Sequence, residues 1–197
     1  TPSHSTVGLR CRVVTPKDLE DAAFLDSVSK GDSDKVFDMM QKGQTLDART
    51  ESRETAIHLA VNARDNKMLR LLLKADKTGE LVDTGDKKGV RPIAVAVKLN
   101  QRELFDTLVQ NGADVSKVNE HDKTTLLHTA CWAGHEDMLE LLLKTGAFNG
   151  ELLEAQDTDG RTALHTGAFR GSEEVCKLLV DAGAQGVASG DKWGNKP

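Results

Sequence analysis

Several residue types are scarce in this chain, and each shortage excludes a class of structure or of function. There is no tyrosine, and aromatic residues make up only 4% of the 197 positions, so a core must be built mainly from Leu, Val, Ile and Ala. No apolar run approaches the ~20 residues that a membrane-spanning helix needs. Residues 1–15 contain no continuous apolar stretch of the kind that defines a secretory signal. We therefore expect no membrane insertion.

Cysteine is equally sparse. The chain has three cysteines, which are widely separated: Cys11, Cys131 and Cys176. An odd number at this spacing matches neither a disulfide framework nor a zinc site. We expect no metal and no cofactor, and we place the chain in a reducing, intracellular compartment, the cytoplasm.

Clustered positive charge is missing as well. Lys and Arg number 26 against 31 Asp and Glu, which gives a formal net charge of −5. Nucleic-acid-binding surfaces need clustered Lys and Arg, and no basic stripe occurs in the sequence. No phosphate-binding loop occurs either. The sequence thus disfavours nucleic acids and small-molecule substrates as partners.

The chain does contain one short phrase that recurs. Four clear copies are residues 55–60 (TAIHLA), 91–96 (RPIAVA), 125–130 (TLLHTA) and 162–167 (TALHTG). A degenerate copy begins at residue 22 and a last one at residue 196, so the steps between copies are 33, 36, 34, 37 and 34 residues. The phrase opens a predicted helix in each unit. In the fourth unit, for example, the pattern predicts helices over 125–133 and 136–144, with Gly134 between them and Gly146 after them.

A period near 33 residues around a T-P-L-H-x-A core is the sequence signature of ankyrin repeats, and the chain resembles that family from residue 17 onward. The resemblance implies an all-α solenoid of stacked helix-turn-helix units with short hairpin-like fingers. It also implies a concave groove, lined by first helices and fingers, that binds another protein. Turn-rich connections such as 86–89, 157–160 and 191–194 supply the Asp and Gly that tight finger turns favour.

The unit boundaries follow from the period. Residues 1–16 have none and are expected to be extended or disordered, and residues 17–197 form the repeat domain. We expect an N-terminal cap over about 17–50, with polar residues on its outer face. Full repeats start near 51, 87, 121 and 158, and 191–197 opens a further repeat. That partial repeat and the absence of an initiating Met indicate a piece of a longer protein.

The units also depart from the pattern at particular places. Arg91 and Ala94 replace the Thr and His of the phrase, and Gly167 replaces its small Ala; we expect the third unit to be less rigid than its neighbours. The spacers 74–85 and 144–156 are longer than the pattern requires, and such insertions are expected to form loops.

Residues in or next to the repeated phrase suggest two kinds of chemistry, metal binding by the histidines and hydrolysis by a cysteine. His58, His128 and His165 share one phase, but units stack about 10 Å apart, far beyond the ~2.1 Å bond of a zinc ligand. The resemblance implies instead that each His bonds to the nearby Thr and to the backbone of the adjoining turn. A cysteine hydrolase using Cys131 with His128 or His135 lacks an oxyanion hole. We therefore predict no catalytic residue and no enzyme activity in the chain.

The partner-binding prediction rests on the aromatic residues. Trp132 and Phe169 occupy equivalent positions on the first helices of the fourth and fifth units, at a phase that in the ankyrin family points into the groove. Trp193 falls at a finger tip. The predicted partner-binding residues are Trp132, Phe169, Arg170, Arg161, His121, Lys98 and Trp193. An alternative is that Trp132 leans on neighbouring helices and Trp193 covers an exposed end of the stack.

These observations lead to one function and one alternative. The groove runs from polar and basic to aromatic, which suits an extended peptide with acidic and apolar parts. We predict a protein–protein interaction module that binds a partner protein or peptide in this groove. The alternative is a regulatory or targeting module for an enzyme or channel domain outside these residues.

Overall fold

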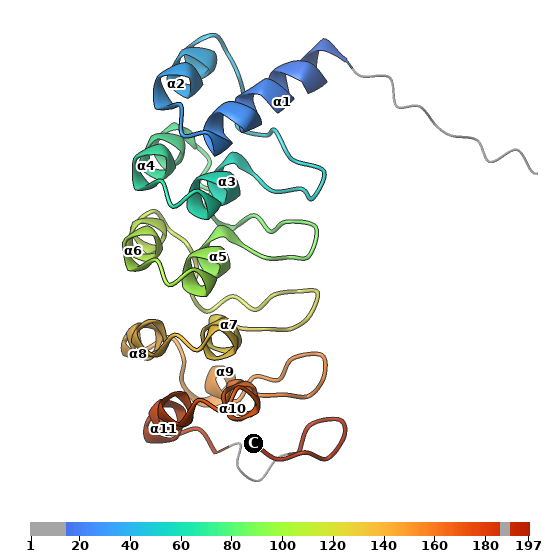
Figure 1. Ribbon diagram of the computed structural model, residues 1–197, viewed down its shortest axis with the longest axis vertical. Helices are drawn as coiled ribbons and strands as arrows, with labels where there is room; N and C mark the ends of the chain where they lie inside the picture. The colour runs from blue at the N-terminus through green and yellow to red at the C-terminus, as the bar shows by residue number, and fades with distance from the viewer. Residues whose placement is uncertain (1–14, 186–189) are drawn as a thin grey trace, which may run out of the picture.

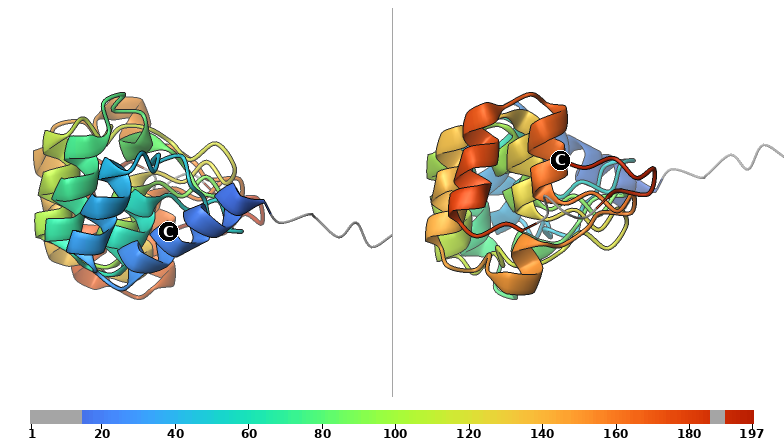
Figure 2. Two further views of the ribbon diagram at one scale, coloured as in Figure 1. Left: turned by 90° about the horizontal axis from the view of Figure 1, so that it is seen from above. Right: turned by 90° about the horizontal axis from the view of Figure 1, so that it is seen from below.

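The computed structural model describes residues 15–185 and 190–197, and the expected extended segment falls largely on residues 1–14, outside the described part. The chain forms a single stack of antiparallel helix pairs, and the described residues contain no β-strand. In Figure 1 the outer helices, the inner helices and a row of projecting loops lie side by side along the whole stack. Figure 2, which views the stack from its two ends, shows the same three layers in projection. The all-α ankyrin-type solenoid is therefore confirmed.

Each unit contributes one inner and one outer helix. The five pairs are α1 (Pro16–Ser29) with α2 (Ser33–Gln41), α3 (Ala56–Asn62) with α4 (Asn66–Ala75), α5 (Pro92–Lys98) with α6 (Arg102–Gln110), α7 (Leu126–Ala133) with α8 (Glu136–Lys144), and α10 (Ala163–Phe169) with α11 (Glu173–Asp181). We number these pairs as units 1 to 5. Helix α1 begins at Pro16, with Thr15 as its N-cap, so two residues of the expected segment 1–16 already belong to the first helix and its cap.

The inner helices of units 2, 4 and 5 begin in the same way. Thr55, Thr125 and Thr162 are N-caps, and in each case the hydroxyl accepts a hydrogen bond from the backbone N–H of the His three residues later. The Nδ1 atom of that His lies 2.9 Å from the Thr hydroxyl and accepts the Thr backbone N–H. Because Nδ1 accepts a hydrogen bond from a backbone N–H, it carries no proton itself. The ring is therefore neutral, with its proton on Nε2.

That second nitrogen connects one unit to the next. Nε2 of His58 lies 2.9 Å from the carbonyl oxygen of Val90, and Nε2 of His128 lies 2.9 Å from that of Arg161. Nε2 of His165 is buried and has no hydrogen-bond partner among the described residues. His58 and His128 therefore have the structural role that the resemblance implies, whereas His165 bonds only to its own Thr and not to the adjoining turn.

Unit 3 lacks both Thr and His, and a buried arginine replaces them. The guanidinium of Arg91 donates to the carbonyl oxygens of Asp114, at 2.6 Å, and Lys117, and it forms an ion pair with Asp83 at 3.1 Å. Arg91 is only 5% exposed. Asp83 lies in the 3₁₀ helix η1 (Leu81–Asp83), inside the first long spacer. The insertion thus supplies the carboxylate that the substituted arginine requires, and the two departures from the repeat pattern compensate each other.

Both long spacers contain short helices where loops were expected. The first holds η1, and the second holds α9 (Gly150–Leu153). Each insertion buries apolar side chains against the stack, namely Val82 in the first and Phe148 and Leu153 in the second. Burial of these side chains favours a short ordered turn over an extended loop, because it removes apolar surface from water.

The projecting loops, or fingers, are hairpins that bond to one another. Each is closed by a hydrogen bond from the backbone N–H of its first residue to the carbonyl of its last, and we number them by the unit that they open: finger 2 (50–54), finger 3 (86–90), finger 4 (119–124), finger 5 (157–161) and finger 6 (191–195). Backbone bonds then join neighbours, from Lys87 to Ser52, Thr158 to Asp122 and Lys192 to Asp159. Finger 4 is one residue longer, and there the side-chain amide of Asn119 donates to the carbonyl of Lys88.

The histidine bonds between units generate a stability prediction. His128→Ala removes the contact with Thr125 and the bond to the carbonyl of Arg161, whereas His165→Ala removes only the equivalent contact with Thr162. One net hydrogen bond contributes about 1 kcal/mol. We expect His128→Ala to lower the free energy of unfolding by about 1 kcal/mol more than His165→Ala, measured by urea denaturation followed by circular dichroism at pH 7.5. Equal losses for the two variants would show that the bond from His128 to the next unit adds nothing to the free energy of unfolding.

The same histidines predict a pH dependence. Burial is the main reason that the pKa values of His58 and His128 lie below the usual 6.5. Near pH 6.5 these histidines bind protons in the unfolded chain but not in the folded chain. Their contribution to the free energy of unfolding is therefore complete above this pH and falls as the pH drops below it. Each His contributes a slope of at most about 1.4 kcal/mol per pH unit. Urea denaturation between pH 7.5 and 5.5 should show a shallower slope for His128→Ala than for the parent chain; an identical slope contradicts this origin.

The buried arginine generates a third prediction. Arg91→Met keeps most of the side-chain volume but leaves two carbonyl oxygens without their donor and Asp83 without its cationic partner, which should cost about 3 kcal/mol or more in the free energy of unfolding. The matched control is Arg102→Met, which removes an exposed ion pair with Asp106 and should cost less than about 1 kcal/mol. Combined with Asp83→Asn, the Arg91 substitution should be less costly than the sum of the two single effects. Additive losses would show that the pair is not coupled.

Candidate partner-binding groove

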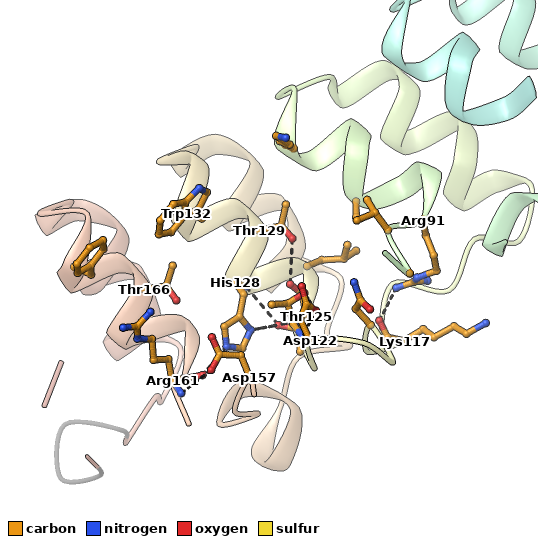
Figure 3. Close-up of a pocket in the computed structure, with 18 residues that line it drawn as sticks. Arg91, Lys117, Asp122, Thr125, His128, Thr129, Trp132, Asp157, Arg161 and Thr166 are labelled. Carbon is orange, nitrogen blue, oxygen red and sulfur yellow. Dashed lines mark hydrogen bonds between the residues drawn. The ribbon is translucent and has the colours of Figure 1, made fainter. Parts of the chain in front are cut away.

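The inner helices and fingers of units 3 to 5 line a groove of about 340 Å³. All three inner helices contribute to its helical side: Ala94 and Lys98 on α5, Leu126, His128, Thr129 and Trp132 on α7, and Thr166 and Phe169 on α10. Figure 3 shows Trp132 and Thr166 toward one end, with Arg91 and Lys117 toward the other. The groove lies on the face that the inner helices share with the fingers.

Four of the seven predicted residues line this groove, namely Trp132, Phe169, Arg161 and Lys98. Lys98, Trp132 and Phe169 each stand seven residues after the opening residue of their phrase, so the stacking of units brings them into one row. Trp132 is 53% exposed and Phe169 is 70% exposed. Large rings with this much exposure are not core residues of the stack.

The other three predicted residues lie beside the groove. Arg170 is the C-cap of α10, and its Cζ atom lies 5.3 Å from the ring centroid of Trp132. Trp193 lies in finger 6 and is 61% exposed. His121 is an exposed residue of finger 4, and the structure places it next to Gly89 of finger 3.

The aromatic residues and arginines form one continuous set of contacts. The rings of Trp132 and Phe169 stack with an interplanar angle of 8° and a centroid separation of 6.1 Å. The Cζ atom of Arg161 lies 5.8 Å from the ring centroid of Phe169 and 4.9 Å from that of Trp193. We call these five residues, in the order Arg170, Trp132, Phe169, Arg161 and Trp193, the aromatic–arginine ladder. It spans units 4 and 5 and finger 6.

Arg161 is held in the ladder from several sides. Its guanidinium lies 3.8 Å from a carboxylate oxygen of Asp159 and 3.7 Å from one of Asp191. These separations exceed ordinary hydrogen-bond lengths, so the carboxylates bias the position of the side chain without using up its donors. The backbone of the same residue accepts the bond from His128. Arg161 therefore belongs to both the stack and the candidate site.

Sequence analysis missed several residues of the groove. Thr129 and Thr166 stand one helical turn before Trp132 and Phe169, so the same phase argument, applied to the preceding turn, would have found them. Lys117 precedes finger 4 in a segment with no periodic pattern, and only the fold brings it to the groove. No signal in the local sequence marks it.

The cysteine and histidine that were weighed for hydrolase chemistry have other roles in the structure. The Cys131 thiol is fully buried, and burial raises its pKa to about 12, so almost none is present as the reactive thiolate at neutral pH. Both ring nitrogens of His128 are already engaged. Across residues 15–185 and 190–197, no three His, Cys, Asp or Glu side chains gather as metal ligands. None of the helices in that part of the chain is long and apolar enough to cross a bilayer.

Comparison with known proteins agrees with this architecture. The family model described as ankyrin repeats (3 copies) matches residues 24–119 and 114–189. The chain is 28% identical to the nuclear factor NF-kappa-B p105 subunit of Gallus gallus over 95 residues, which are 48% of this chain and 10% of that protein. It is 31% identical to the tyrosine-protein kinase Shark of Drosophila melanogaster over 119 residues, 59% of this chain and 12% of that protein.

A third relative is the neurogenic locus notch homolog protein 1 of Homo sapiens, 30% identical over 113 residues, 57% of this chain and 4% of that protein. The chain thus spans between 4% and 12% of the length of these three curated relatives. The two matches to the family model together run from residue 24 to residue 189 and cover most of the chain. The chain therefore belongs to the ankyrin repeat family.

Proposed function

We propose that this chain binds an extended segment of a partner protein in the groove of units 3 to 5. Ankyrin repeats are protein–protein interaction modules whose stacked units create extended concave surfaces. The observation that supports this particular location is the exposed stack of Trp132 on Phe169 at the edge of the groove. Aromatic side chains dominate the energetics of protein interfaces, and tryptophan is enriched among residues whose truncation weakens binding most.

The geometry favours an extended segment over a bulky ligand. The groove follows the stacking direction, because its lining residues come from three successive inner helices. Each of these helices presents a different side chain at the same phase: Lys98, Trp132 and Phe169. A segment lying along the row would therefore meet a cationic side chain first and two aromatic rings next. This order gives the groove a direction, which a symmetric apolar pocket would lack.

Peptide selection tests the proposal. We would select 12-residue peptides from a random display library on the immobilised chain and measure their affinity by fluorescence anisotropy. Trp132→Ala/Phe169→Ala should weaken the selected peptides about 30-fold or more, because truncating one residue of this kind costs ~2 kcal/mol. Circular dichroism would establish that the variant keeps its helices.

A matched control separates the groove from apolar exposure in general. Phe37 on α2 and Val109 on α6 are exposed apolar residues outside the groove, at 47% and 39%. Phe37→Ala/Val109→Ala should leave the affinity of the same peptides unchanged. Peptides that bind the Trp132→Ala/Phe169→Ala variant as tightly as the parent would place the binding surface elsewhere and contradict the proposal.

A further inference from the structure

In the aromatic–arginine ladder, arginines of the same chain already occupy cation-binding positions over the aromatic rings. Each of its three rings has a guanidinium over it: Arg170 over Trp132, and Arg161 over both Phe169 and Trp193. A ring face attracts positive charge because of its quadrupole. A partner lysine or arginine would have to displace these intramolecular contacts before it could bind to the ring faces. The ladder is therefore poorly suited to a cationic ligand.

What the ladder leaves available is a set of hydrogen-bond donors. A guanidinium held against a ring keeps a planar fork of N–H groups that matches a carboxylate. Arg170 forms no ion pair with any other described residue, and Arg161 has only the two long contacts with Asp159 and Asp191. The edges of aromatic rings carry partial positive charge. Across its exposed edge the ladder thus attracts negative charge.

The groove beside the ladder has the same electrostatic character. Lys98 and Lys117 line it and pair with no carboxylate in the described part of the chain. The lining contains two carboxylates, Asp122 and Asp157, which accept hydrogen bonds from neutral donors of their own fingers and keep their charge. The four cationic residues of the lining, Arg91, Lys98, Lys117 and Arg161, outnumber them. The chain as a whole carries a net charge of −5, so this cationic surface is local.

We infer that the ladder and the groove together recognise an acidic segment of a partner protein, whose carboxylates bind Arg170, Arg161 and the groove lysines while an apolar side chain contacts the stacked rings. This inference rests on the proposed function and adds the chemistry of the partner. A nucleic acid, the other polyanion that aromatic and arginine residues can bind, is disfavoured by the negative net charge, because long-range repulsion opposes the approach of an extended phosphate chain.

The first arm of the test uses the composition of the selected peptides. Among peptides that lose binding in the Trp132→Ala/Phe169→Ala variant, we expect Asp and Glu to be enriched over the unselected library. An Asn and Gln version of such a peptide, synthesised with the same length, should bind about tenfold more weakly or worse, because hydrogen bonds between charged groups are lost. Peptides that depend on the rings but show no acidic enrichment would overturn this inference and leave the proposed function intact.

The second arm changes the protein. Arg170→Gln should weaken the acidic peptide about tenfold, and Arg170→Lys should also weaken it, because lysine keeps the charge but loses the planar fork. Arg70 is an exposed residue of α4 outside the groove, so Arg70→Gln removes the same charge as a control and should have no effect. Equal losses in Arg170→Gln and Arg70→Gln would reduce the effect to net charge and overturn the inference.

A third arm addresses the competing polyanion. A twelve-nucleotide oligothymidylate at the same ionic strength should neither bind with comparable affinity nor displace the acidic peptide. If it does both, the site recognises phosphate and the inference fails. If the selected peptides bind without depending on Trp132 and Phe169 at all, this inference and the proposed function fail together. Intrinsic fluorescence gives an independent signal, because both tryptophans of the chain belong to the ladder.

Discussion

The stack depends on a neutral histidine buried between two units. Its Nδ1 atom accepts from the capping threonine of its own helix, and its Nε2 atom donates to the last carbonyl of the next finger, as at His58 and His128. The first bond fixes where the inner helix begins, and the second fixes where the following unit lies. Because the two bonds use opposite edges of one rigid ring, the start of α3 or α7 and the position of the unit that follows it are set together.

Unit 3 shows that this constraint can be met by different chemistry. Arg91 reaches the carbonyls of Asp114 and Lys117 in the connection to unit 4, and its charge is balanced by Asp83 from the neighbouring insertion. A buried guanidinium without a carboxylate would be costly, so the substitution and the insertion are understandable only as a pair. Arg91 thereby retains the connection to the next unit that a histidine makes elsewhere. The expectation that unit 3 is less rigid than its neighbours stays a prediction.

Fixed stacking also explains how the side chains that line the groove can differ from unit to unit without cost to the core. Lys98, Trp132 and Phe169 share one phase, stand in a row on successive inner helices and point away from the packed interior. Arg161 belongs to both the stack and the ladder, because its backbone accepts the stacking bond from His128 while its side chain contacts the rings of Phe169 and Trp193. The bond from His128 to the backbone of Arg161 thus joins unit 4 to the finger that carries part of the ladder.

The sequence by itself determined the repeat, the helices within each unit and the residues that share a phase. The prediction of a helix over 136–144 matches α8 to the residue, and the row of Trp132 and Phe169 followed from their equal offsets. These features depend on local periodicity, which the chain carries in its own order. Only the tertiary structure decided that Arg91 would pair with Asp83, that the insertions would bury Val82 and Phe148, and that Lys117 would line the groove. Those contacts join residues with no fixed spacing in the repeat, and they form only when stacking brings separate segments within reach.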